Sequence, residues 1–177
     1  ALTCDDGPNG RHTIAILDVL RERGIRAVFA VVGEQIRRPG GPQILQRIVR
    51  DGHLLCAHGM TFDDMGDWSP DAVRADIDEF LATLRYGLGG LDAPLYYFRA
   101  PNGNWGRTAH IAVEYGMQPL GVVNTIGDWR DQDPDLLATR LRQAMKPGQV
   151  VLAHDGGGDR SGTAAAFATV LDERIAE

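Results

Sequence analysis

The sequence predicts an α/β fold in which parallel strands curve into a barrel. Short β-rich runs alternate with stretches of helical apolar spacing along the whole chain, in about six or seven strand–helix units. Such alternation is typical of a parallel sheet with helices packed outside it. Polar residues also follow five different predicted strands. The carboxyl ends of strands converge on one mouth in a barrel but spread along an edge in an open, doubly wound sheet, so this distribution favours the barrel.

The predicted strands are short apolar runs, and the first is the most informative. It ends at Thr3 and is followed by two adjacent carboxylates, Asp5 and Asp6, before a Gly7-Pro8 turn. Adjacent side chains on an extended segment point to opposite sides, so the two carboxylates can do different work. The predicted strands cover residues 1–3, 27–32, 53–57, 95–98, 119–124 and 150–153.

The predicted helices are recognised by apolar residues that recur with a period near 3.6. Two of them also carry clear start signals. Ser69 and Asp133 are each followed by a proline, which places a capping side chain before the first helical position. The predicted helices cover residues 13–23, 42–50, 70–86, 107–115, 133–145 and 162–175.

Composition limits the class of protein. The chain has 177 residues, 44% hydrophobic and 24% charged, as expected for a single globular domain over 1–177. It starts within a predicted strand and stops within a predicted helix, so we expect a domain trimmed at both ends. No apolar run reaches the roughly 18 residues of a membrane span. The net charge of −6 disfavours nucleic acid as a partner, and Cys4 and Cys56 are too few for a disulfide framework, so we expect free thiols.

The polar residues at the predicted strand ends form a set with complementary chemistry. A carboxylate and a neutral imidazole are common ligands of zinc and related ions. A second carboxylate and a second histidine are suited to general base and general acid catalysis. An arginine would keep the base ionised, and a further aspartate would raise the pKa of the acid histidine. Together they suit metal-assisted attack of water on a carbonyl. The set is Asp5, Asp6, His58, Arg99, Asp128 and His154.

These residues lie in five ordered motifs that resemble those of the polysaccharide deacetylases, the NodB-homology domains of carbohydrate esterase family 4. The segment 3–8 is similar to the family's Thr-Phe-Asp-Asp-Gly-Pro, with Cys4 in place of Phe, and His58 begins the counterpart of His-(Ser/Thr)-x-x-His. The other three motifs are Arg99-Ala100-Pro101-Asn102-Gly103, Asp128-Trp129 and Leu152-Ala153-His154. The resemblance covers essentially the whole chain and implies a distorted (β/α)7–8 barrel, NodB-like.

The resemblance implies a catalytic role for each member of the set. Asp5 would be the general base, oriented by Arg99. His154 would be the general acid, tuned by Asp128. Asp6 and His58 would be ligands of a divalent metal, Zn²⁺ or alternatively Co²⁺.

The resemblance also implies a binding site for the substrate. Trp129 and Leu152 would line a pocket for the acetyl methyl group. The backbone just after Pro101 would help to bind the oxyanion, a contribution of several kcal/mol for such donors. Asn102 belongs to the same motif, and Trp105 follows it at the barrel mouth, where its ring would stack on a sugar.

One motif departs from the family pattern. Its fifth position should be a second histidine ligand and is Phe62 in this chain. Three alternatives follow: water or substrate completes the metal shell, a neighbour (Asp63, Asp64 or His12) replaces the ligand, or the site is lost and the domain only binds sugar. Because the base, the acid and both orienting partners are present, we expect an enzyme that acts on an amide bond.

The expected substrate is an N-acetylated amino sugar of the N-acetylglucosamine type. A small glycoside, such as a glycopeptide-antibiotic pseudoaglycone, would imply a cytoplasmic enzyme of antibiotic biosynthesis. A chitin-type or cell-wall polymer would imply an extracellular one. The motifs are equally compatible with an acetyl ester. Outside the motifs, we expect structural or surface roles for His53 and His110, and a flexible loop at residues 155–158.

Overall fold

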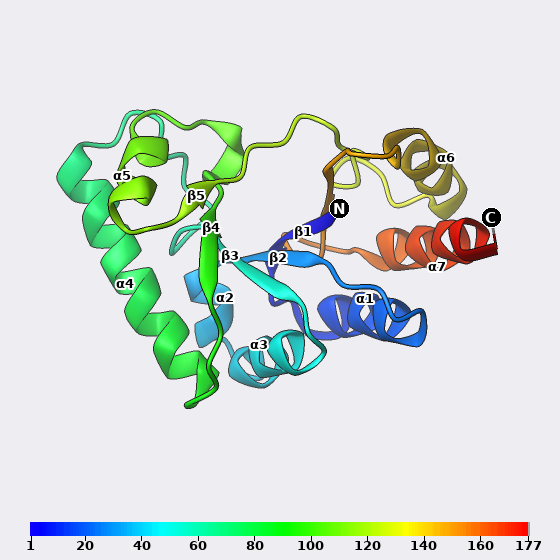
Figure 1. The fold of residues 1–177 in the computed structure, drawn as a ribbon, viewed down its shortest axis with the longest axis horizontal. Coiled ribbons are helices and arrows are strands. Elements are labelled where there is room, and N and C mark those ends of the chain that lie inside the picture. Colours follow the sequence, from blue (N-terminus) through cyan, green and yellow to red (C-terminus); the bar gives the residue numbers. More distant parts are fainter. Residues whose placement is uncertain (177) are drawn as a thin grey trace.

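A parallel sheet of six strands, in the order β5-β4-β3-β2-β1-β6, forms the centre of the computed structural model, which describes residues 1–176 (Figure 1). Neighbouring strands are parallel throughout, as the alternating pattern predicts. The strands are β1 (Leu2–Gly7), β2 (Val28–Val31), β3 (Leu54–Ala57), β4 (Leu95–Phe98), β5 (Gln118–Pro119) and β6 (Val151–His154).

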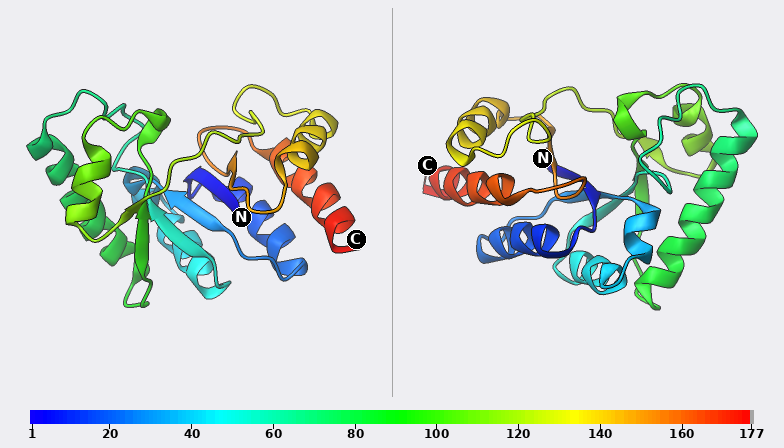
Figure 2. Two further views of the ribbon diagram at one scale, coloured as in Figure 1. Left: turned by 45° about the horizontal axis from the view of Figure 1, so that its top comes forward. Right: turned by 180° about the vertical axis from the view of Figure 1, so that it is seen from behind.

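Seven α-helices among the described residues cover the outside of this sheet. In Figures 1 and 2 they follow its curvature, and consecutive helices along this outer layer contact one another in the order α6, α7, α1, α3, α4, α5, with α2 beside α3 and α4. The helices are α1 (Gly10–Glu22), α2 (Gly33–Arg37), α3 (Gly41–Arg50), α4 (Pro70–Leu88), α5 (Thr108–Glu114), α6 (Pro134–Ala144) and α7 (Ser161–Ala176). A short 3-10 turn, Pro101–Gly103, follows β4.

The sheet curls into a half-barrel, and this confirms the predicted fold class with fewer strands than a full barrel. The segment between β5 and α6 spans the open side. Its backbone pairs with β6 through an isolated bridge at Thr125, where Leu152 N–H donates to Asn124 O at 2.9 Å and Ile126 N–H donates to Leu152 O at 3.2 Å. The strand predicted over 119–124 is therefore wrong beyond Pro119. Val123, an apolar residue of that run, is 97% exposed because no sheet face covers it.

The core lies between the sheet and the helical layer. Four phenylalanines from both layers are fully buried there: Phe29, Phe80, Phe98 and Phe167. Each such side chain contributes about 1.5–3 kcal/mol relative to an exposed position. The short strands and the apolar faces of the helices thus provide the hydrophobic surface that holds the strand ends in place.

The predicted helix starts are confirmed at both caps. Ser69 Oγ accepts a hydrogen bond from Ala72 N–H, and Asp133 Oδ1 accepts from Leu136 N–H at 3.0 Å. The five-residue helix α2 was not predicted, since it is too short to show a periodic pattern. Cys4 and Cys56 are free, as expected, and both are buried. None of the helices that the structure describes is long and apolar enough to cross a membrane.

Candidate active site

The carboxyl ends of the strands surround one cavity of about 940 Å³. Strands β1, β3, β4 and β6 all contribute, so the residues predicted from separate motifs come together as a barrel mouth requires. The predicted site residues that line the cavity are Asp5, Asp6, His58, Arg99, Asn102, Trp105, Trp129, Leu152 and His154.

Asp5 and Asp6 both face this cavity because the backbone of β1 is irregular between them. The pairing of β1 with β2 shifts between Asp5 and Gly7, and Asp6 has a left-handed φ of 78°. A bulge of this kind re-aims a side chain that regular alternation would send to the other face. The strand end therefore presents two carboxylates to one cavity.

Asp5 is paired with a buried arginine. The Arg99 guanidinium donates from Nη1 to Asp5 Oδ1 at 2.5 Å and to Thr3 Oγ at 2.9 Å, and from Nε to Leu120 O at 2.9 Å. Asp5 and Arg99 are only 3% and 4% exposed. Burial raises the pKa of Asp5, and the positive charges of His58, Arg99 and His154 offset part of that rise. The result is an oriented carboxylate with increased basicity.

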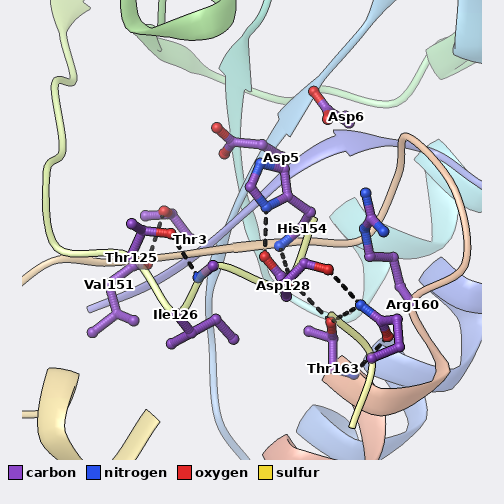
Figure 3. A network of polar contacts seen from close by, with 12 residues as sticks. Thr3, Asp5, Asp6, Thr125, Ile126, Asp128, Val151, His154, Arg160 and Thr163 are labelled. Atoms are coloured by element: carbon purple, nitrogen blue, oxygen red, sulfur yellow. Dashed lines mark hydrogen bonds and ion pairs between the residues drawn. The ribbon is translucent and has the colours of Figure 1, made fainter. Parts of the chain in front are cut away.

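His154 is paired with a fully buried aspartate (Figure 3). Its Nδ1 lies 2.7 Å from Asp128 Oδ1, and its backbone N–H donates to Asp128 Oδ2 at 2.8 Å. Thr163 Oγ also donates to Asp128 Oδ2, at 2.9 Å. Burial alone would lower the pKa of His154, but the charges of Asp128, Asp5 and Asp6 raise it above its ordinary value. These contacts leave Nε2 of a readily protonated imidazole for chemistry.

Asp6 and His58 are the pair with the chemistry of metal ligands. His58 Nδ1 lies 2.8 Å from the carbonyl oxygen of Arg99, which fixes the ring and leaves Nε2 3.4 Å from Asp6 Oδ1. Burial alone would raise the pKa of Asp6, but the hydrogen bond from His58 and the nearby positive charges lower it. An imidazole whose far nitrogen is already hydrogen-bonded and an ionised carboxylate are ligands that suit a divalent cation, although catalytic zinc usually has three protein ligands.

The expected replacements for the missing histidine lie elsewhere. Asp63 and Asp64 are exposed in a turn and accept hydrogen bonds from Thr61 and Gly66. His12 Nδ1 accepts a hydrogen bond from Arg160 N–H at 3.3 Å. None of the three lines the cavity. Across residues 1–176, no group of three or more His, Cys, Asp or Glu side chains forms a metal site.

All the residues predicted to bind substrate line the cavity except Pro101. The Trp129 ring packs edge-on against His154 with centroids 5.3 Å apart and remains 45% exposed. Trp105 also lines the cavity and lies edge-on against Phe98, with ring centroids 6.4 Å apart. Pro101 is buried and does not line the cavity, because it starts the 3-10 turn that carries Asn102.

The turn after β6 is built differently from the flexible loop that the sequence suggested. The N–H groups of Asp155 and Gly156 both donate to Asp5 O at 3.0 Å. The Asp155 side chain is fully buried and accepts from Thr13 Oγ at 2.6 Å. Its burial raises its pKa to about 7. The turn therefore ties β6 to β1 through Asp155 and Gly156, whereas Gly157 and Gly158 are exposed.

The family motifs do not include two residues of the site, Arg160 and Thr163. Thr163, which supports Asp128, comes from α7, and Arg160, which lines the cavity, precedes that helix. The run Asp155-Gly156-Gly157-Gly158 is the sequence feature that could have indicated them, because a glycine-rich turn lets neighbouring side chains come close to its backbone. The other histidines have the expected structural or surface places: His53 Nδ1 accepts from Ala27 N–H, and the His110 side chain is exposed.

Comparison with known proteins places these features in a family. The sequence profile of the family described as "Polysaccharide deacetylase" matches residues 1–120. A chitooligosaccharide deacetylase of Rhizobium leguminosarum bv. phaseoli is 32% identical over 164 residues, which span 88% of this chain and 67% of that protein.

Several solved structures have a fold similar to that of this chain. The Bc1960 peptidoglycan N-acetylglucosamine deacetylase superposes with a TM-score of 0.88 at 26% identity, over 99% of this chain and 81% of that one. A mutant of BA3943, a carbohydrate esterase family 4 pseudoenzyme with restored activity, has a TM-score of 0.85 at 23% identity and is covered over 62% of its length. From the matched profile, the sequence identity and the motifs at the strand ends, the chain belongs to the polysaccharide deacetylase family.

Proposed function

We propose that this protein is a hydrolase that removes the acetyl group from an N-acetylated amino sugar of the N-acetylglucosamine type. One observation carries the proposal: a base paired with arginine, Asp5–Arg99, and an acid paired with aspartate, His154–Asp128, face one cavity. The relatives named as deacetylases of chitooligosaccharides and of peptidoglycan support this class of substrate.

The residues of the site divide the reaction between them. Asp5, held by Arg99, removes a proton from the attacking water, whose oxygen forms a bond to the amide carbon. The electron pair of the C=O bond moves to the oxygen. When that electron pair forms the C=O bond again and the C–N bond breaks, His154 donates its proton to the leaving nitrogen. The products are acetate and a free amino sugar.

Asp6 and His58 are the residues that would hold a divalent metal, Zn²⁺ or Co²⁺. Such an ion polarises the carbonyl and makes water more acidic. With two protein ligands, water or substrate would complete the coordination of the ion. The hydrogen bond from His58 to the Arg99 carbonyl keeps the ligand ring oriented whether the ion is present or absent.

The cavity walls suit a sugar. Trp129 and Leu152, beside His154, would contact the acetyl methyl group, and Trp105 offers a ring face to a pyranose. Asn102, with a left-handed φ of 59°, carries the backbone N–H that would face the oxyanion. We propose chitooligosaccharide-like or peptidoglycan-like substrates first, and small glycosides such as a glycopeptide pseudoaglycone as the alternative.

A second function is a sugar-binding domain without catalysis. Phe62 in place of a histidine favours it, as does the similar fold of a protein named a pseudoenzyme. Acetate release from N-acetylglucosamine oligomers and N-acetylglucosaminyl glycopeptides, with added Zn²⁺ or Co²⁺, distinguishes the two. We expect turnover by the wild-type chain and none by Asp5→Ala or His154→Ala. Sugar binding without acetate release from any of these substrates would favour the second function.

A further inference from the structure

Arg160 is a buried cation in the wall of the cavity that the mechanism above does not use. It lies between β6 and α7 and is 6% exposed. Its Nη1 donates to the Asp159 carbonyl at 2.5 Å. Its Nε is buried and has no hydrogen-bond partner among the described residues. Figure 3 shows the guanidinium pointing to the Asp6 side of the network. The unpaired N–H donor of this guanidinium can therefore bind a ligand that is not part of the protein.

No carboxylate of the described residues lies within 4.0 Å of the Arg160 guanidinium. Asp159, the adjacent acid, is turned to Ser161 and His12. Asp6 lines the same cavity, and the positive charge of Arg160 is one of the causes that lower the pKa of Asp6. A Cβ on Gly157 would stand 2.9 Å from Asp6 Oδ2 and 3.3 Å from Arg160 Nη2, so this glycine is what allows both groups to approach the same spot. A buried cation is costly without a compensating negative charge, which identifies the missing ligand as an anion.

The position of Arg160 narrows the choice of anion. A guanidinium matches a pair of carboxylate-like oxygens with two parallel N–H donors. Arg160 Nη2 and Asp6 Oδ2 lie on either side of the position that a Gly157 Cβ would take, and Asp6 is adjacent in sequence to the base Asp5. Under the proposed function, an acetyl group attacked by water at Asp5 would lie beside these groups. Resting on the proposed function, we propose that Arg160 is a further catalytic residue, which binds the oxygen that becomes negative when water attacks and then the carboxylate of the acetate product.

This role also fits the change at Phe62. The chain has one ligand fewer than the family pattern, and a guanidinium supplies fixed positive charge near the developing oxyanion. The same charge disfavours a cation at Asp6. Removing it should therefore weaken the binding of acetate and strengthen the binding of Zn²⁺, two effects of opposite sign that partial unfolding would not produce together.

Acetate binding tests the proposal without any need for turnover. Acetate is titrated into the full chain, without and with added Zn²⁺, and followed by NMR line broadening. We expect Arg160→Met to weaken acetate binding about tenfold or more, the scale of one charge-assisted hydrogen bond. Arg160→Lys should keep part of the affinity. Arg107→Met, which removes an exposed arginine outside the cavity, should change nothing. Circular dichroism of each variant checks that it is folded.

Kinetics with a neutral N-acetylglucosamine oligomer provide the second readout. Arg160→Met should lower kcat while KM stays unchanged, because the oxyanion exists only in the transition state. Unchanged acetate affinity in a folded Arg160→Met protein would overturn the proposal. An effect confined to KM for substrates with their own carboxylate would overturn it too, since Arg160 would then bind a substituent. If the chain shows no turnover at all, the proposed function fails while the acetate titration still decides the role of Arg160.

Discussion

His154 Nδ1 lies 2.7 Å from Asp128 Oδ1, across 26 residues of sequence. Asp128 is fully buried, and its carboxylate accepts two hydrogen bonds from His154 and one from Thr163. The pair therefore sets both the orientation of the imidazole ring and its tendency to hold a proton. The cavity side of the ring remains for the substrate.

Asp128→Asn should slow the enzyme and change its pH dependence. Asp128 raises the pKa of His154, so its neutralisation should lower that pKa and move the descending limb of the kcat–pH profile to lower pH. We expect kcat to fall by about 10²–10⁴, the usual share of general acid–base catalysis. Steady-state kinetics across the pH range measures both effects. Thr163→Val, which removes only the supporting hydroxyl, should produce a smaller shift in the same direction. An unchanged kcat–pH profile in Asp128→Asn would contradict the role of Asp128 in raising the pKa of His154.

Asp6→Ala should abolish metal binding. With Phe62 in place of a histidine, Asp6 and His58 are the two protein ligands that remain. Loss of a supporting residue behind a ligand costs 10–100-fold in affinity, so loss of the ligand itself should cost at least about 100-fold. Metal content after dialysis against Zn²⁺ provides the measurement. Asp63→Ala, an exposed carboxylate outside the cavity, is the control. Stoichiometric zinc in Asp6→Ala would show that the ion is held elsewhere.

Gly157→Ala should damage the site more than the fold. The new Cβ would stand 2.9 Å from Asp6 Oδ2, and the φ of 74° adds backbone strain of about 1–3 kcal/mol. Gly148→Ala is a matched control, because Gly148 has a φ of 79° and no atom within 4 Å of the added Cβ. Both variants should lose similar stability in thermal unfolding, whereas only Gly157→Ala should lose activity. Full activity in Gly157→Ala would mean that the space between Asp6 and Arg160 is not needed.

Asp155→Asn should flatten the pH dependence of stability. The pKa of Asp155 is about 7 in the folded protein and about 4 in the unfolded chain, so the folded state binds the extra proton between these values. The free energy of unfolding of the wild-type chain should therefore fall as pH rises from about 4 to about 7. Thermal unfolding of both proteins at pH 5 and pH 8 is the measurement. The Tm difference, Asp155→Asn minus wild type, should be larger at pH 8 than at pH 5. An equal Tm difference at the two pH values would refute the raised pKa of Asp155.

Much of the fold could be predicted because its signals are local. Ser69 and Asp133 mark helix starts through hydrogen bonds to N–H groups two or three residues away, and the structure has both. The helix α2 and the end of the run 119–124 could not be predicted. A five-residue helix shows no period, and an apolar run becomes a strand only where a neighbouring strand accepts its hydrogen bonds.

The sequence by itself determined the family motifs and, through the strand-end rule, that Asp5, His58, Arg99 and His154 would meet at one mouth. Only the tertiary structure decided that Asp6 turns to the same side as Asp5, since a bulge depends on the partner strand. It also decided that Asp155 is buried against Thr13 and that Arg160 enters the cavity. Those outcomes depend on which neighbours pack around a side chain, and sequence spacing carries no record of contacts made across the sheet.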